Sequence, residues 1–507
     1  MIIIKQEDLI QSVADALQYI SYYHPTDYIQ ALGRAYELEQ NPAAKDAIAQ
    51  ILTNSRMSAE GRRPICQDTG IVTVFIKVGM GIRWDGSTMS VTDMINEGVR
   101  RSYTHPDNIL RASIVNPPEG ARINTQNNTP AVIHYEIVSG NNLDLQITAK
   151  GGGSENKSKF AMLNPTDSII DWVLKTVPTM GAGWCPPGML GIGIGGTAEK
   201  SMLMAKESLM DSINIQDVIS RGPLNWIEAL RIELYKKVNM LGIGAQGLGG
   251  LSTVLDVKII AAPTHAASKP IAIIPNCAAT RHVHFTLDGT GSIRLDPPPL
   301  KSWPNVHWRP DTRNSQRVNL DILTREQVSG WKSGQTLLLS GKILTGRDAA
   351  HKRIVDMLAH GYPLPVDFKN RVIYYVGPVS PVRDEVVGPA GPTTSSRMDM
   401  FTEIMLEKTG LISMIGKAER GPAAINAIKK HKAAYLIAVG GAAYLLSKAI
   451  RSSRILAFEE LGMEAIFEFE VKDMPVTVAI DSNGTSIHQI GPKEWKTKIN
   501  EISILAM

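Results

Sequence analysis

Residues 294–314 read RLDPPPLKSWPNVHWRPDTRN, and this proline-rich stretch decides how the chain is divided. Proline lacks a backbone N–H and has a fixed φ, so clustered prolines disfavour both a helix and a central strand. We therefore predict a linker over 294–314, one domain before it over 1–293 and a second, smaller one after it over 315–507. With 507 residues, the chain is long enough for each domain to bury its own core.

On the N-terminal side of the linker, strand-like runs alternate with helical ones, which is the pattern of an α/β domain. Residues 1–57 repeat apolar positions at helical spacing, so we expect a helical start. The strand-like runs are IVTVFIKV (71–78), AVIHYEIV (131–138), LDLQITA (143–149), VLDVKIIAA (254–262) and KPIAIIPN (269–276). The helical runs are VTDMINEGVRRSY (91–103), TDSIIDWVLKTV (166–177), GTAEKSMLMAKESLM (196–210) and WIEALRIELYKKVNML (226–241).

The alternation resumes after the linker, so the fold class predicted for the whole chain is two α/β domains. In such domains, loops at strand ends carry the groups that face a substrate. The strand-like runs include TLLLSGKIL (336–344), RVIYYVGPV (371–379), AAYLIAVGG (433–441) and VTVAID (476–481). The helical runs include DAAHKRIVDMLAHG (348–361), SSRMDMFTEIMLEKTG (395–410), GPAAINAIKKH (421–431) and AYLLSKAI (443–450).

Composition excludes several classes of protein. Lys and Arg number 53 against 49 Asp and Glu, an excess too small to favour nucleic acid as a partner. The apolar stretch at 433–446 is shorter than the roughly 20 residues that span a bilayer, so we expect no membrane span. The first residues, MIIIKQEDL, include acidic side chains and no small-residue cleavage site, so we expect no signal peptide and a cytoplasmic protein.

Three cysteines, Cys66, Cys185 and Cys277, are too few and too odd in number for a disulfide framework. Each lies in a turn-prone context, in RRPICQDTG, GAGWCPPGMLGIGIGG and IPNCAATRH. Such loops can direct backbone amides at a cluster sulfide. Three thiolates can bind three irons of a cubane and leave the fourth open for Lewis-acid catalysis. Three unrelated buried thiols remain the alternative.

Two glycine runs, GIGIGG (191–196) and GIGAQGLGG (242–250), resemble dinucleotide loops. Neither follows the order of strand, G-x-G-x-x-G and helix with an acidic residue about 20 positions on. We interpret both as loops that allow close backbone approach to a cluster.

The chain resembles the class I fumarate hydratases over nearly its whole length. The resemblance rests on the three cysteine motifs and on AKGGGSENKSKF, GIGAQGLGG, PTHAASKP, SGKILTGRDAAHKR, YYVGPV, GPAGPTTSSRMD and ISMIGKAERG. It implies an oxygen-sensitive enzyme that interconverts two small dicarboxylates, fumarate and (S)-malate. It also implies a homodimer with a 4Fe-4S cluster on Cys66, Cys185 and Cys277 between the two domains.

The resemblance assigns the reacting groups as well. Asp68 would protonate the departing hydroxyl during dehydration, Gln67 would help to bind substrate, and Thr393 would remove the proton from carbon. The residues alone do not show whether Thr393 or Thr394 is the base. For Asp68 the alternative is a structural role, because an aspartate before Thr-Gly ordinarily caps a turn. The serines and threonines of this motif could instead be N-caps of a helix near Arg397, with Ser395 and Ser396 as candidates.

The remaining substrate contacts are cationic or small groups. A guanidinium can bind a carboxylate through two N–H groups, and the resemblance assigns Arg111, Arg347, Arg397 and Lys417 to the carboxylates. It also places His265 in the substrate pocket, where this residue could be contributed across the dimer. The alternative is that His265 is a core histidine bonded to backbone. The backbone of Gly151 would contact substrate.

Other functions stay open at this point. Related hydro-lyases act on mesaconate, L-tartrate or mercaptosuccinate with the same cluster and carboxylate contacts. An iron-sulfur redox sensor would need only the cysteines, and a zinc protein would need paired cysteine spacing that the chain lacks.

Overall fold

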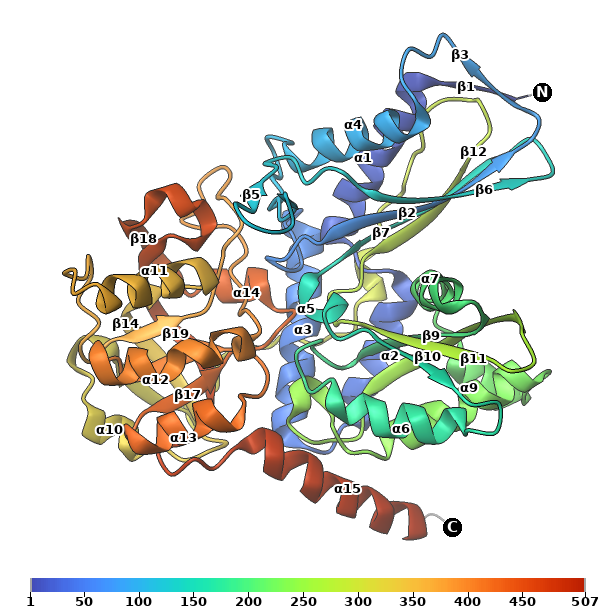
Figure 1. Ribbon diagram of the computed structural model, residues 1–507. Coiled ribbons are helices and arrows are strands. Elements are labelled where there is room, and N and C mark those ends of the chain that lie inside the picture. Colours follow the sequence, from blue (N-terminus) through green and yellow to red (C-terminus); the bar gives the residue numbers. More distant parts are fainter. Residues whose placement is uncertain (1, 506–507) are drawn as a thin grey trace.

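The computed structural model describes residues 2–505, with side chains described through Ile502 (Figure 1). The predicted α/β class is confirmed, and the strands gather into three main sheets. The predicted domains also include Met1, Ala506 and Met507, which lie outside the described residues.

The N-terminal segment differs from the predicted helical start in its first residues. Ile2–Lys5 form strand β1, which pairs in parallel with β3 (Ile82–Asp85). Three successive isoleucines are β-branched and favour a strand over a helix. The predicted helices follow as α1 (Gln6–Tyr22), α2 (Thr26–Leu38) and α3 (Pro42–Gly61).

The first main sheet has the order β12-β7-β2-β6. Helices α1 and α4 (Val91–Tyr103) contribute apolar side chains to the same core as this sheet, and α4 has the bounds that the sequence predicts. The Ser90 side chain accepts a hydrogen bond from Asp93 N (3.1 Å) and caps α4. The strands are β2 (Ile71–Gly79), β6 (Val132–Val138), β7 (Leu143–Lys150) and β12 (His282–Leu287).

The second sheet has the order β10-β9-β11-β8, with a core of its own. Helices α6 (Ile169–Thr179) and α9 (Trp226–Asn239) contribute to this core, while α7 (Ala198–Ser208) packs on the other face. The strands are β8 (Lys159–Leu163), β9 (Gly188–Gly196), β10 (Val254–Thr264) and β11 (Lys269–Asn276).

Our interpretation of the 191–196 glycine run as a loop is wrong, because this run is part of the buried strand β9. A Cβ on Gly191 would lie 2.1 Å from Ala205 O, and one on Gly193 would lie 1.9 Å from Ser201 O. These glycines therefore let the backbone of α7 pack directly on the strand.

The linker contains one short helix, η2 (Leu300–Ser302), within the described residues 294–314, and it is fixed against the N-terminal helices. Trp303 is buried and donates from Nε1 to Ser55 Oγ (2.9 Å), and Trp308 donates from Nε1 to Asp46 Oδ1 (2.6 Å). Among residues 2–293, the two four-stranded sheets have separate cores, and the domain boundary at 294–314 stays a proposal.

The third sheet has the order β13-β14-β15-β16-β17-β19-β18. Strands β13 to β17 run parallel, while β19 runs antiparallel to β17 and pairs with β14 as well, so part of the sheet closes on itself. The strands are β13 (Gln316–Asn319), β14 (Thr336–Thr345), β15 (Val372–Tyr374), β16 (Ser413–Gly416), β17 (Ala434–Ile437), β18 (Ile450–Ala457) and β19 (Ile466–Ile480). Helices α11 (Asp348–Ala359), α12 (Asp399–Lys408) and α13 (Pro422–Lys430) belong to the same part of the chain.

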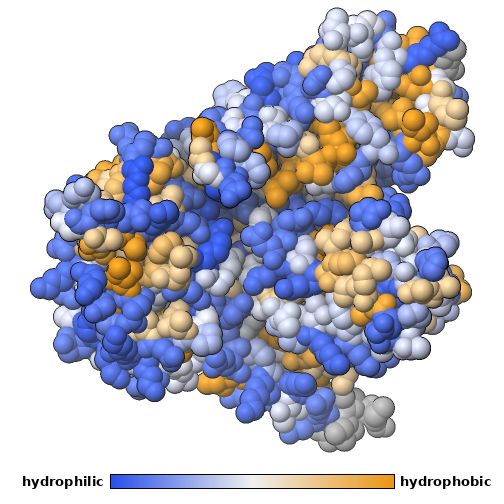
Figure 2. Space-filling view, in the orientation of Figure 1, coloured by the Kyte–Doolittle hydropathy of each residue, from blue (hydrophilic) through white to orange (hydrophobic). Residues whose placement is uncertain are grey.

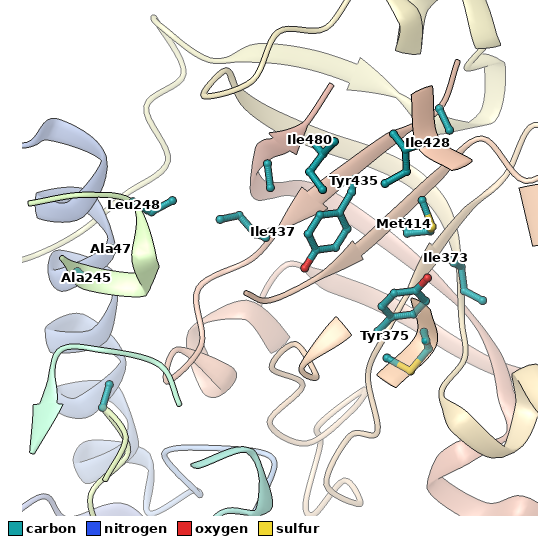
Figure 3. Close-up of a cluster of buried hydrophobic side chains, with 14 of the residues drawn as sticks. Ala47, Ala245, Leu248, Ile373, Tyr375, Met414, Ile428, Tyr435, Ile437 and Ile480 are labelled. Carbon is teal, nitrogen blue, oxygen red and sulfur yellow. The ribbon is translucent and has the colours of Figure 1, made fainter. Parts of the chain in front are cut away.

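A shared apolar core joins this sheet to the N-terminal helices (Figure 3). Ala47 and Leu248 come from the N-terminal side, and Ile373, Met414 and Tyr435 come from the sheet or its edge. Because these side chains are buried together, the two sides of the linker are packed against each other.

The remaining elements are short, apart from the C-terminal helix α15 (Ile487–Leu505), which has no counterpart among the predicted helices. They are β4 (Val115–Asn116), β5 (Ile123–Asn124), α5 (Gly152–Glu155), α8 (Ile215–Arg221), η1 (Ala245–Gly247), η3 (Leu320–Ile322), α10 (Arg325–Ser329), η4 (Ser395–Met398), α14 (Ala443–Ser447) and η5 (Glu459–Glu464). No helix in residues 2–505 is long and apolar enough to cross a membrane.

Apolar side chains reach the surface on two strands. Val132, Tyr135 and Ile137 are exposed on β6, and Phe160 and Met162 are exposed on β8. Figure 2 shows apolar patches on the side of the molecule where Figure 1 places these two sheets.

Candidate active site

Asn54 of α3 joins two loops that lie on opposite sides of the linker in the sequence. Its buried side chain donates from Nδ2 to Ile65 O and to Gly441 O, both at 3.0 Å. Its Oδ1 accepts from Tyr444 N and Leu445 N, both at 2.9 Å. One side chain therefore holds the loop before Cys66 beside the connection that follows β17.

The three cysteines lie in loops, as their sequence contexts predict, and the structure brings these loops together. Cys66 lies between α3 and β2, Cys185 precedes β9, and Cys277 directly follows β11. Ala278 N donates to Cys185 O (3.1 Å), and Cys66 and Cys277 belong to one small apolar cluster with Ala279. All three thiols are free.

Lys417, directly after β16, lies against these thiols. Its Nζ donates to Cys185 Sγ (2.8 Å). Burial alone would lower the pKa of Lys417, but the negative charge available on Cys185 and Cys66 raises this pKa above its usual value. Burial raises the pKa of the Cys66 thiol to about 11, although Arg281 and Lys417 oppose that effect.

Asp68 lies among cations two residues after Cys66. Its Oδ1 is 3.5 Å from Arg111 Nη2, and its Oδ2 accepts from Gly152 N (2.8 Å). Burial would raise the pKa of this carboxyl, but Arg111 and Arg281 outweigh burial and lower it. A Cβ on Gly151 would lie 3.2 Å from Asp68 Oδ2, so the glycine leaves the carboxylate accessible from this side.

The threonine motif lies between the ends of β15 and β16. Thr393 N donates to Tyr375 O (2.8 Å), and Lys417 N donates to Thr393 O (3.2 Å). The Thr394 hydroxyl donates to Gly183 O (3.4 Å), whereas the Thr393 hydroxyl has no hydrogen bond to any residue that the structure describes. Gln67 is tied to the same motif, because its Nε2 donates to Pro392 O (3.2 Å).

The alternative that this motif supplies a side-chain N-cap is wrong. The short helix η4 begins after Thr394, and α12 begins after Met398, yet neither residue caps its helix through a side chain. The hydroxyl groups of the motif are therefore not used in helix capping.

Arg347 and Arg111 carry guanidinium atoms that lack an acceptor. Arg347 Nη2 is 3.4 Å from Glu464 Oε1, but its buried Nε and Nη1 have no hydrogen-bond partner among residues 2–505. Arg111 Nε is in the same situation, and burial lowers the pKa of Arg111 to about 10. A buried donor without an acceptor is costly, so this arrangement favours a bound anion.

Arg397 lies at the edge of the same group. Its Nη2 is 3.1 Å from Asp348 Oδ2, and its side chain is 40% exposed. Burial lowers the pKa of Arg397, Asp348 raises it, and Arg347 lowers it further, so the two arginines lie close enough to affect each other.

Sequence reasoning missed Arg281, which is 2% exposed. Its Nη1 donates to Asp68 O (2.7 Å), while Nε and Nη2 have no partner in the described part of the chain. Its position four residues after Cys277, inside the motif IPNCAATRH, is the signal that could have identified it.

His265 is not brought to this site within one chain. It is exposed in the turn between β10 and β11, where its Nδ1 accepts from Ala267 N (3.1 Å). The reading of a buried histidine is therefore wrong, and a contribution across a dimer stays a proposal.

No three His, Cys, Asp or Glu side chains among residues 2–505 converge on a single metal ion. Three thiols that bind three different irons need not converge on one point. Together, the loops at the ends of strands, the free thiols and the unpaired guanidinium atoms form a candidate active site that suits a small anion.

Comparisons with known proteins identify the class of enzyme. The family model described as fumarate hydratase (Fumerase) matches residues 10–286, and the one described as Fumarase C-terminus matches residues 289–491. The anaerobic class I fumarate hydratase of Escherichia coli K12 is 30% identical, over 92% of this chain and 86% of its own length. Fumarate hydratase 2 of Leishmania major is 30% identical, over 92% and 84%.

A third relative matches a smaller part of this chain. The putative L(+)-tartrate dehydratase subunit alpha of Methanocaldococcus jannaschii is 37% identical, over 53% of this chain and 94% of its own length. The extent of the fumarate hydratase matches decides the family. The protein is a hydro-lyase, and the chain belongs to the class I fumarate hydratase family.

Proposed function

We propose that this protein is an iron-sulfur hydro-lyase that interconverts fumarate and (S)-malate. The observation that carries the proposal is the set of buried guanidinium atoms without acceptors, among the described residues, on Arg111, Arg281 and Arg347. A dicarboxylate would supply acceptors for such atoms, and bidentate contacts would fix its orientation.

Cys66, Cys185 and Cys277 are the residues that would hold a 4Fe-4S cluster. Their free thiols come from three loops, and Lys417 lies within hydrogen-bond distance of Cys185 Sγ, so a negatively charged group suits this place. When bound, such a cluster supplies an open iron that acts as a Lewis acid toward the substrate carboxylate and hydroxyl.

Thr393 and Asp68 are the proposed proton-transfer groups. During dehydration, Thr393 removes the proton from carbon, and Asp68 gives a proton to the departing hydroxyl. Arg111 and Arg281 lower the pKa of Asp68 in the free site, so this role requires the charges of a bound dicarboxylate to offset the arginines and raise that pKa. A threonine hydroxyl is a weak acid, so a nearby cation must stabilise its ionised form. Lys417 is the proposed cation, because its backbone N–H donates to Thr393 O (3.2 Å) and its Nζ lies in the same candidate site, against Cys185 Sγ (2.8 Å).

The cationic side chains orient the substrate. Arg347 and Arg397 hold the carboxylate distant from the cysteines, and Arg111 reaches toward Asp68 Oδ1 (3.5 Å). Gln67 and the backbone of Gly151 contact the substrate beside Asp68. These contacts turn the carbon proton toward Thr393, which is an orientation effect.

The proposal includes a homodimer and a location in the cytoplasm. Exposed apolar residues on β6 and β8, such as Ile137 and Met162, favour a homodimer. In that dimer, His265 reaches the partner's site, since β8 pairs with β11 next to the turn that carries His265. Free thiols suit a reducing compartment, so we place the protein in the cytoplasm.

The test compares kcat/KM for fumarate, (S)-malate, mesaconate and L-tartrate after anaerobic reconstitution with iron and sulfide. We expect the highest values for fumarate and (S)-malate. The tartrate relative matches about half of this chain, whereas the fumarate hydratases match nearly all of it, which favours fumarate. Higher kcat/KM for mesaconate or L-tartrate would overturn the substrate assignment.

A further inference from the structure

The glycine-rich loop 242–250 contains a buried polar side chain, that of Gln246, which has no part in the proposed reaction. Gln246 is 5% exposed and lies within η1, between α9 and β10. Its φ is 54°, in the left-handed region that non-glycine residues rarely adopt. Surrounding contacts must therefore hold this conformation.

Those contacts use both the amide nitrogen and the oxygen of the Gln246 side chain. Nε2 donates to Pro186 O (3.1 Å) and to Gly440 O (3.2 Å). Oε1 accepts from Gly440 N (2.9 Å), and the backbone N–H of Gln246 donates to Pro186 O (2.7 Å). One amide therefore connects the segment after Cys185 to the connection that follows β17.

Both partners of Gln246 enclose Cys185. Pro186 is the next residue in the chain, and a Cβ on Gly440 would lie 2.4 Å from Cys185 Sγ. The same Cβ would lie 3.1 Å from Gln246 Oε1. The position of the Cys185 thiol thus depends on two segments that Gln246 holds at a fixed separation.

The loop is itself anchored from behind. Asn41 Nδ2 donates to Gly249 O (2.7 Å), and the buried Glu39 carboxylate accepts from Leu251 N (3.0 Å). A Cβ on Gly249 would lie 2.5 Å from Gly491 O, so α15 packs closely on the loop. These contacts make the loop a rigid support for Gln246.

We propose that Gln246 is a positioning residue that holds Cys185 and the 438–441 connection in the geometry that retains an iron-sulfur cluster. This inference rests on the proposed function, because it requires a cluster on Cys185. Gln246 acts through Pro186 and Gly440 and touches neither substrate nor reacting atoms.

The test measures how fast an iron chelator removes the cluster from anaerobically reconstituted protein, followed by visible absorbance. Gln246→Glu keeps the size of the side chain but replaces the amide donor with an oxygen that faces Pro186 O and Gly440 O. Gln246→Met removes all three side-chain hydrogen bonds without adding charge. We expect both variants to lose the cluster about tenfold faster than the unchanged protein, the effect of losing buried hydrogen bonds.

Gln18→Glu is the matched control. Gln18 Nε2 donates to Ser102 O (2.7 Å) and Asn108 O (3.1 Å), and its Oε1 accepts from Asn108 Nδ2 (2.9 Å), so it has the same bonding pattern away from the cysteines. We expect Gln18→Glu to lose the cluster at the unchanged rate. In the Gln246 variants, we also expect faster hydrogen exchange in residues 438–445.

Two results would overturn the inference while leaving the proposed function intact. One is an unchanged rate of cluster loss in Gln246→Met, and the other is equal acceleration by Gln18→Glu. If the unchanged protein takes up no iron and sulfide, the proposed function fails, and this inference fails with it.

Discussion

Lys417 Nζ lies 2.8 Å from Cys185 Sγ, although the two residues belong to opposite sides of the linker. The contact places a cation from the end of β16 against a thiol that precedes β9. An ammonium group that donates to sulfur at this distance forms a charge-assisted hydrogen bond. The contact therefore joins the two parts of the chain at the candidate site.

We expect Lys417→Met to lower kcat/KM about 100-fold or more, the typical effect of removing a preorganised charge from an active site. Steady-state kinetics with fumarate measures this change. Lys408→Met is the control, because Lys408 is exposed and pairs with its neighbour Glu407 at the surface. Equal kcat/KM in the two variants would contradict a role of Lys417 at the site.

Arg347→Lys should raise KM for fumarate about tenfold or more, because lysine cannot reproduce the planar fork that binds a carboxylate through two N–H groups. Arg353→Lys is the control, since Arg353 lies on the helix that follows Arg347 and pairs with Glu460 at the surface. We expect the control to keep the original KM. If Arg347→Lys has the same KM as the unchanged protein, the unpaired guanidinium atoms of Arg347 do not bind substrate.

The two threonines of GPAGPTTSSRMD can be separated by isosteric variants. Thr393→Val should lower kcat about 100-fold or more, since proton transfer by a positioned group contributes at least that much. Thr394→Val should change kcat only a few-fold, because the Thr394 hydroxyl already donates to Gly183 O (3.4 Å). The opposite order of effects would identify Thr394 as the base.

The buried His351 should make the free energy of unfolding depend on pH. Burial lowers the pKa of His351 to about 4 in the folded protein, from 6.5 for an unperturbed histidine. The unfolded chain therefore binds a proton below pH 6.5 that the folded protein excludes. The free energy of unfolding should be highest above this pH and should fall toward about pH 4, by at most about 1.4 kcal/mol per pH unit from this group.

His351→Asn should weaken that pH dependence, measured as the difference in unfolding midpoint between about pH 7 and about pH 5. His360→Asn is the control. His351 Nδ1 contacts the carbonyl four residues earlier, Arg347 O (2.8 Å), and His360 Nδ1 contacts Asp356 O (2.7 Å) in the same way, but His360 is exposed, just after the same helix. An unchanged pH dependence in His351→Asn would contradict this account.

Regular alternation makes much of the fold predictable. The run VTDMINEGVRRSY has helical spacing and a serine before it, and α4 has the predicted bounds, Val91–Tyr103. The loops that carry the cysteines are also predictable, because glycine or proline lies close to each one. These signals are local, so they need no knowledge of tertiary contacts.

The glycines of β9 show what local signals miss. Gly191 and Gly193 indicate a loop by composition, yet they are buried because α7 packs on them. The same limit applies to Gln246 and Arg281, whose partners lie far away in the sequence. Short β1 escapes prediction because a four-residue strand depends on its partner β3.

The measurement that tests the central claim most directly is anaerobic turnover of fumarate by protein reconstituted with iron and sulfide, beside a Cys185→Ser variant treated identically. We predict about four iron and about four sulfide ions per chain, the stoichiometry of a 4Fe-4S cluster, and turnover that is lost in the variant. A fully loaded protein that does not hydrate fumarate, or a variant with equal turnover, would contradict the account.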